Sequence, residues 1–107
     1  DYSRALVAYK VGAEGGRALS QHQVGTMYCQ GRGVAVDYQQ ARAWLEKAAA
    51  QDRPNAVNSL GVMYKNGEGV TPSWRRAREL YQRAIELGSS MSVEDMQTLT
   101  EDIQKVS

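Results

Sequence analysis

The sequence has no phenylalanine, one cysteine and one histidine. The scarcity of cysteine and histidine excludes an internal disulfide and a zinc site of the usual type. The single cysteine, Cys29, cannot form an internal disulfide, so the chain is not a small disulfide-stabilised scaffold. Together with the single histidine, His22, it provides too few ligands for a zinc site of the usual Cys/His type. We therefore expect no metal ion and no other cofactor.

An excess of one charge and long apolar runs are also lacking. Lys and Arg number 13 against 12 for Asp and Glu, which gives a formal net charge of +1. A chain so nearly neutral has no strong field to attract nucleic acid or an anionic membrane, so neither is expected as a partner. No apolar run approaches the roughly 20 residues that a membrane-spanning helix needs. Because the chain begins with Asp1 rather than Met, we expect it to be a fragment of a longer protein.

What the sequence does contain is a repeat: shifted by 36 positions, it aligns with itself without a gap. Most of the matched positions are glycines, tyrosines and alanines. They include Tyr2 with Tyr38, Gly25 with Gly61, Met27 with Met63, and Gly31 with Gly67. A period of this length is typical of stacked pairs of helices rather than of one globular core.

Each repeat unit is expected to form two helices, because its apolar residues recur at positions i, i+3, i+4 and i+7. The expected first helices are Leu19–Gln30 and Asn55–Asn66. The expected second helices are Tyr2–Glu14, Tyr38–Ala50 and Trp74–Leu87. The predicted fold class is therefore all-α, an α/α solenoid of antiparallel helix pairs.

Glycines mark both the ends and the contact points of the expected first helices. Gly31 and Gly67 fall where the backbone must turn left-handed, a conformation that glycine adopts at the least cost. Gly25 and Gly61 lie inside the helices, although glycine there costs about 1 kcal/mol relative to alanine. A glycine repeated at this internal position predicts close contact between the paired helices.

The end of the chain departs from this pattern. Residues 89–92 read Ser-Ser-Met-Ser, which we interpret as a linker, with Ser92 and Asp95 resembling a capping box. A helix is then expected over Val93–Val106, with an apolar face formed by Val93, Met96, Leu99, Ile103 and Val106. We expect this helix to cap the open end of the stack, because terminal units need a polar outer face. The alternative is that its apolar face is a seam for a dimer or for a partner.

The spaced residues of the second unit resemble the Sel-1-like repeat, a longer-looped relative of the tetratricopeptide repeat. They read Ala56-x3-Leu60-Gly61-x-Met63-Tyr64-x2-Gly67-x-Gly69-Val70, then Trp74-x2-Ala77-x3-Tyr81-x2-Ala84. The resemblance covers roughly residues 1–88, and it departs from the family pattern at Ser20, Val24 and Asp52-Arg53. Some bacterial members of this family carry a disulfide in every repeat, which a chain with one cysteine cannot.

The resemblance divides the chain into four parts. Residues 1–18 are expected to be the second helix of an incomplete first repeat, which leaves an open N-terminal edge. Residues 19–52 and 53–88 are expected to be complete repeats, and residues 89–107 to be the linker and the capping helix.

The resemblance also implies a scaffold or adaptor that binds a peptide or a partner domain on a concave surface lined by first helices. Packing occupies Leu60, Gly61 and Tyr64, so by analogy with tetratricopeptide repeats the other positions face the groove. The residues expected there are His22, Thr26 and Cys29 in one repeat, and Asn55, Asn58, Val62 and Lys65 in the next. Asparagine can donate to and accept from a peptide backbone. The alternative interpretation is ordinary solvated helix surface.

Catalysis is not expected. His22 and Cys29 are seven residues apart on one helix, about 10.5 Å along its axis, which is far beyond the reach of a nucleophile and its base. The Gly-rich segments after Gln30 and Asn66 follow helices and lack the Gly-Lys-Ser/Thr of a phosphate-binding loop, so we interpret them as turns. The arginines of the second helices are interpreted as a solvated convex face.

The expected function is therefore protein–protein interaction through the concave face. The alternative is a structural spacer, or a repeat array that self-assembles through its open N-terminal edge, without a specific peptide ligand. These two functions differ in which surface of the stack contacts another molecule.

Overall fold

A computed structural model describes residues 1–106, and all of their side chains except those of Ser90, Met91 and Val106. Within this range the chain is all-α and contains no strand, so the predicted fold class is confirmed. The helices are α1 (Tyr2–Glu14), α2 (Ala18–Gln30), α3 (Tyr38–Ala50), α4 (Pro54–Asn66), α5 (Trp74–Glu86) and α6 (Ser90–Val106). The bounds of α1 to α5 agree with the predicted ones to within one residue.

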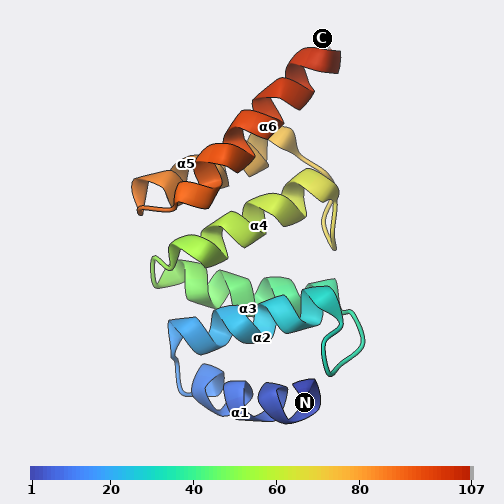
Figure 1. Cartoon of the computed structure of the whole chain (residues 1–107), viewed down its shortest axis with the longest axis vertical. Coiled ribbons are helices and arrows are strands. Elements are labelled where there is room, and N and C mark those ends of the chain that lie inside the picture. The colour runs from blue at the N-terminus through green and yellow to red at the C-terminus, as the bar shows by residue number, and fades with distance from the viewer. Residues whose placement is uncertain (107) are drawn as a thin grey trace.

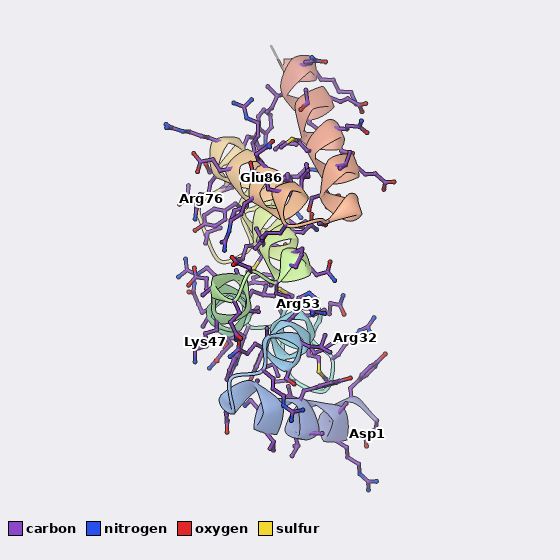
Figure 2. The ribbon with its side chains drawn as sticks, turned by 90° about the vertical axis from the view of Figure 1, so that its left-hand side faces the viewer. Asp1, Arg32, Lys47, Arg53, Arg76 and Glu86 are labelled. Carbon is purple, nitrogen blue, oxygen red and sulfur yellow. The ribbon has the colours of Figure 1, made fainter. Side chains whose placement is uncertain are left out.

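The helices form an elongated stack of 45 × 27 × 20 Å, with α1 at one end and α6 at the other (Figure 1). Each helix packs against its neighbours in sequence, and α4 also contacts both α2 and α6. Seen from the side, α2 and α6 lie along one edge of the stack and α3 and α5 along the other (Figure 2). We call the face formed by α2, α4 and α6 the first-helix face.

The internal glycines allow the paired helices to come very close. A methyl group placed on Gly25 would lie 2.7 Å from Cγ of Leu45, and one on Gly61 would lie 2.6 Å from Cε1 of Tyr81. Carbon atoms in favourable contact are about 3.5 to 4.0 Å apart, so no side chain fits at either position. The close contact predicted from the two glycines is therefore confirmed.

Left-handed residues end the helices, as the repeated glycines predict. Gly31 ends α2 with a φ of 68° and Gly67 ends α4 with a φ of 72°. Asp52, with a φ of 60°, is the one non-glycine residue with positive φ in the described range. It occupies the position held by Gly16 and Gly88 in the neighbouring units. Aspartate tolerates this conformation better than most residues, because its short polar side chain can bond locally.

The C-terminal helix is in register with the repeat, and the expected linker over residues 89–92 is wrong. α2, α4 and α6 begin at residues 18, 54 and 90, so they are 36 residues apart. The backbone N–H of Ser92 donates to the hydroxyl of Ser89 over 3.3 Å, which caps the helix three residues earlier than expected. Ser92 thus lies in the first turn and is not the cap. α6 takes the place of the first helix of a further repeat.

Two positions distinguish α6 from α2 and α4. Where those helices carry the internal glycine, α6 carries the exposed Gln97. Where they end at a glycine, α6 has Ile103 and the helix continues. A second helix could not approach α6 as closely as α3 approaches α2, because the Gln97 side chain occupies the contact point.

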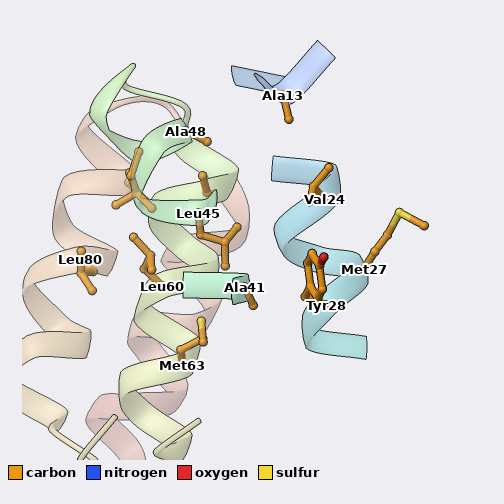
Figure 3. Close-up of a cluster of buried hydrophobic side chains, with 14 of the residues drawn as sticks. Ala13, Val24, Met27, Tyr28, Ala41, Leu45, Ala48, Leu60, Met63 and Leu80 are labelled. Carbon is orange, nitrogen blue, oxygen red and sulfur yellow. The ribbon is translucent and has the colours of Figure 1, made fainter. Parts of the chain in front are cut away.

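The core runs through the stack as a layer of small and branched side chains. The alanines Ala41, Ala48 and Ala84 are fully buried where helices approach one another. Val24 and Leu45 fill the space beside them, and Figure 3 shows these side chains between the helices. This packing fixes the spacing of the first helices and so the shape of the first-helix face.

A second, smaller cluster joins α6 to the stack. Ala77, Tyr81 and Leu99 are buried together, with Met96 and Ile103 packed partly against them. The apolar face predicted for this helix is therefore only partly used: Val93 is 42% exposed, and the side chain of Val106 lies outside those described.

Candidate functional site

A cavity of about 360 Å³ opens between α2, α4 and α6 on the first-helix face. Four of the residues predicted to face the groove line it: Thr26 and Cys29 from α2, and Asn58 and Val62 from α4. The fold thus brings together side chains that lie one repeat apart in the sequence. That these side chains contact a partner stays a prediction.

The cavity also holds two acidic side chains that were not among the predicted residues, Glu68 and Asp95. Glu68 is the middle residue of the Gly-x-Gly turn after α4, and Asp95 lies on α6. No Lys or Arg lines the cavity, and neither carboxylate forms an ion pair within the described residues. The lining therefore has a formal charge of −2.

The two carboxylates raise the pKa values of the neighbouring acidic groups. Burial, with the negative charge of Glu68, raises the pKa of the Cys29 thiol to about 11. The Glu68 charge is the main cause of the raised pKa of the Tyr38 hydroxyl. Burial, with the charge of Asp95, raises the pKa of Tyr81 to about 12. For Cys29 and Tyr81 burial is the larger cause, and the carboxylate charges add to it.

Three of the predicted groove residues have contacts with α6 or its cluster. Asn58 is buried, and its Oδ1 accepts a hydrogen bond from the Ser92 hydroxyl over 2.6 Å. Val62 packs against the cluster that joins α6 to the stack. Nζ of Lys65 lies 3.6 Å from Oδ2 of Asp102, and Lys65 does not line the cavity. The predicted groove residues of α4 with these contacts are therefore already in contact with α6 or with the cluster that joins it to the stack.

The remaining two predicted residues lie outside the cavity. Asn55 is exposed in the first turn of α4. His22 is half-buried on α2, and its pKa is lowered by burial and, to a smaller extent, by the positive charge of Arg53. The predicted surface is therefore divided, and of the predicted residues only Thr26, Cys29, Asn58 and Val62 line the cavity.

The Cys29 thiol in the cavity is not activated as a nucleophile. The raised pKa keeps the Cys29 thiol protonated near neutral pH, which is opposite to the shift that activates a nucleophilic cysteine. Among residues 1–106, no three His, Cys, Asp or Glu side chains are grouped so that they could hold a metal ion.

In the same range, no helix combines the length and the apolar character needed to cross a membrane.

The helix pairs correspond to a known repeat. The Sel1 repeat model matches residues 18–52 and 54–89, which contain the pairs α2–α3 and α4–α5. The chain belongs to the Sel1 repeat family, and the resemblance stated from its sequence is confirmed. Repeats of this family generally act as protein-interaction modules and as non-catalytic scaffolds.

Solved structures share the fold. The Sel1 repeat protein from Oxalobacter formigenes has 33% identity and a TM-score of 0.83, over 90% of this chain and 39% of its own. The protective antigen c5321 of uropathogenic Escherichia coli, which displays an SLR fold, has 39% identity and a TM-score of 0.82, over 86% and 20%. The cysteine rich protein B of Helicobacter pylori has 20% identity and a TM-score of 0.79, over 88% and 71%, which shows the fold alone. The chain thus spans less than half of the first two proteins. No curated protein matches it.

Sequence signals could have placed both acidic residues of the cavity. Glu68 stands where Arg32 stands one repeat earlier, so two otherwise similar turns carry opposite charges. Asp95 is the counterpart of Ser59, which also lines the cavity, if the period of 36 is continued past residue 89. Interpreting the serine-rich residues 89–92 as a linker ends the period of 36 before Asp95, and for this reason Asp95 was not predicted.

Proposed function

We propose that the chain is a protein-interaction module that binds an extended segment of a partner protein in the cavity between α2, α4 and α6. The observation that supports this most is that one open cavity gathers side chains from three successive first helices. Thr26 supplies a hydroxyl for hydrogen bonds, while the partly buried Val62 supplies an apolar wall. The volume of about 360 Å³ lies within the range of roughly 300 to 1,000 Å³ typical of ligand pockets. Binding involves no catalytic step.

Filling the cavity tests this proposal. The labelled chain is applied to an array of eight-residue peptides, each set with one fixed residue and the other positions randomised. Thr26→Trp places a large ring in the cavity, and we expect it to weaken binding of the best sets by about tenfold or more, since tenfold corresponds to 1.4 kcal/mol.

Thr98→Trp is the matched control, because Thr98 is the counterpart of Thr26 on α6 and is exposed outside the cavity. It is expected to bind as the unmodified chain does. Equal binding by the chain and its Thr26→Trp variant would contradict the proposal. So would an unmodified chain that binds no peptide set.

A second candidate function is self-association through α1. Val7 and Val11 are 67% and 71% exposed, and being one turn apart they lie on the same side of the helix. Tyr2 on the same helix is 54% exposed. Neighbouring exposed apolar side chains favour contact with a second copy of the chain. Sedimentation over a range of concentrations tests this: Val7→Ser/Val11→Ser is expected to abolish the association, and Val93→Ser to preserve it. A chain that stays monomeric throughout would eliminate this function.

A further inference from the structure

Three acidic side chains of the described residues are partly buried, Glu68, Asp95 and Asp102, and the two that line the cavity lack a basic partner. Asp52, Glu79 and Asp102 each have a basic partner in the chain, at 2.9 to 3.7 Å. Glu68 and Asp95 have none among the described residues, although both are partly buried. The Tyr38 hydroxyl donates a hydrogen bond to Glu68, but the formal charge of −2 in the cavity lining has no basic residue beside it, so a positively charged ligand would be attracted there.

The lining of the cavity indicates which kind of cation fits. A hard metal ion such as calcium needs six or more oxygen ligands, and no group of three metal-binding side chains occurs within residues 1–106. An organic cation on an aliphatic stem meets different needs. The partly buried Val62 gives the stem an apolar surface, and the carboxylates can receive the charged head.

We infer that the partner segment presents a lysine or arginine side chain, which docks between Glu68 and Asp95. This inference rests on the proposed function and adds the chemistry of the residue that the cavity recognises. The stem packs along α4, and the charged head lies between the turn after α4 and the side of α6. No Lys or Arg lines the cavity to repel such a head.

The peptide array described above gives the test, now scored by the fixed residue. The unmodified chain is expected to retain sets fixed as Lys or Arg about fivefold more than sets fixed as Gln, because a partly exposed charge pair contributes up to about 1 kcal/mol. The variant Glu68→Gln/Asp95→Asn is expected to lose this preference. Raising the salt concentration should reduce the preference of the unmodified chain, since salt screens exposed charges.

Glu94→Gln/Glu101→Gln is the matched control. It removes the same amount of charge from exposed positions of α6 that do not line the cavity, and it should keep the preference. A third variant, Glu68→Lys, should favour sets fixed as Glu or Asp. Because this is a gain of binding, loss of folding could not produce it.

The outcomes separate this inference from the proposed function. Peptide binding without a preference for Lys or Arg overturns the inference and leaves the proposed function in place. A preference that survives Glu68→Gln/Asp95→Asn, or that is lost equally in the control, also overturns the inference. If the unmodified chain binds no peptide, both fail.

Discussion

The hydroxyl of Ser92 donates a hydrogen bond of 2.6 Å to Oδ1 of Asn58, and the two residues are 0% and 4% exposed. This bond joins α6 to α4 inside the stack. The counterparts in the preceding repeat are Ala56 and His22, and alanine has no hydroxyl to form such a bond. α6 is therefore attached to its neighbour by a polar contact that α2 and α4 do not share.

Removing this hydroxyl should destabilise the fold. Ser92→Ala leaves the buried oxygen of Asn58 without its donor, and we expect a loss of about 1 to 2 kcal/mol in the free energy of unfolding. Urea denaturation followed by circular dichroism measures it. Ser20→Ala is the control at the counterpart position on α2, and its effect should stay within about 0.5 kcal/mol. Equal effects of the two substitutions would mean that the bond contributes nothing.

Shortening Leu99 tests whether α6 is an integral part of the stack. Leu99 is fully buried against Ala77 and Tyr81, so Leu99→Ala should lower the free energy of unfolding by about 2 to 4 kcal/mol. Val93→Ala, at a position that is 42% exposed, should have an effect below about 1 kcal/mol. Thermal unfolding of the two variants gives the comparison. Similar melting temperatures would contradict the packing of α6 described above.

Adding one methyl group to Gly61 tests the close approach of α4 and α5. Gly61→Ala would place Cβ 2.6 Å from the Tyr81 ring, and the resulting overpacking should destabilise the fold by about 1 to 3 kcal/mol. The roughly 1 kcal/mol that alanine gains over glycine in a helix offsets part of this cost, so the net loss should be at most about 2 kcal/mol. Gly15→Ala serves as the control, because its nearest contact is 3.4 Å and its φ is −78°. Denaturant midpoints decide the result, and a stabilised Gly61→Ala variant would show that the helices can separate.

The reactivity of Cys29 should report on the charge in the cavity. Only the thiolate is alkylated, so the rate of reaction with iodoacetamide should rise through a midpoint near pH 11, the pKa that burial and Glu68 produce. In concentrated urea the midpoint should return to about 8.5. Glu68→Gln should move the folded-state midpoint to lower pH, because removing a negative charge makes the thiolate less unfavourable. A midpoint near 8.5 in the folded chain would refute the assignment.

Most of the fold could be predicted because the repeat contains glycines at positions where the backbone conformation or the available space permits few other residues. Gly25 and Gly61 predicted helix contacts, and those contacts are made by the paired residues Leu45 and Tyr81. Gly31 and Gly67 predicted the ends of α2 and α4. A glycine at such a position is informative, because few other residues adopt the same backbone conformation or fit the same space.

The C-terminal helix was placed less well because its signals are weaker. Ser89, Ser90 and Ser92 suggested a linker, yet the Ser89 hydroxyl caps the helix and the Ser92 hydroxyl enters the core. Gln97 and Ile103 replace the two glycines that identify the other first helices. Without those glycines, the register of 36 residues remains only in the apolar positions, where Val93, Met96 and Leu99 correspond to Val57, Leu60 and Met63.

The site was predicted in part for the same reason. The analogy with tetratricopeptide repeats placed Thr26 and Cys29 on the groove side of α2, and both line the cavity. The engagement of Lys65 by Asp102, however, depends on where α6 lies, which spacing within one helix does not specify. Asp95 reaches the cavity from α6, so it was missed together with the register of that helix.

Because α2, α4 and α6 begin at a constant spacing of 36 residues, the stack can be lengthened by duplicating one repeat. Duplicating residues 54–89 would insert one whole helix pair while α1 and the α4–α6 junction kept their own contacts. The number of cavities on the first-helix face would then increase with the number of inserted pairs. The cavity next to α6 would then carry Lys65 in the place of Cys29, and the cavity before it Ser59 in the place of Asp95, so the two would select different partner residues. A partner segment that fills both would gain affinity through multivalency.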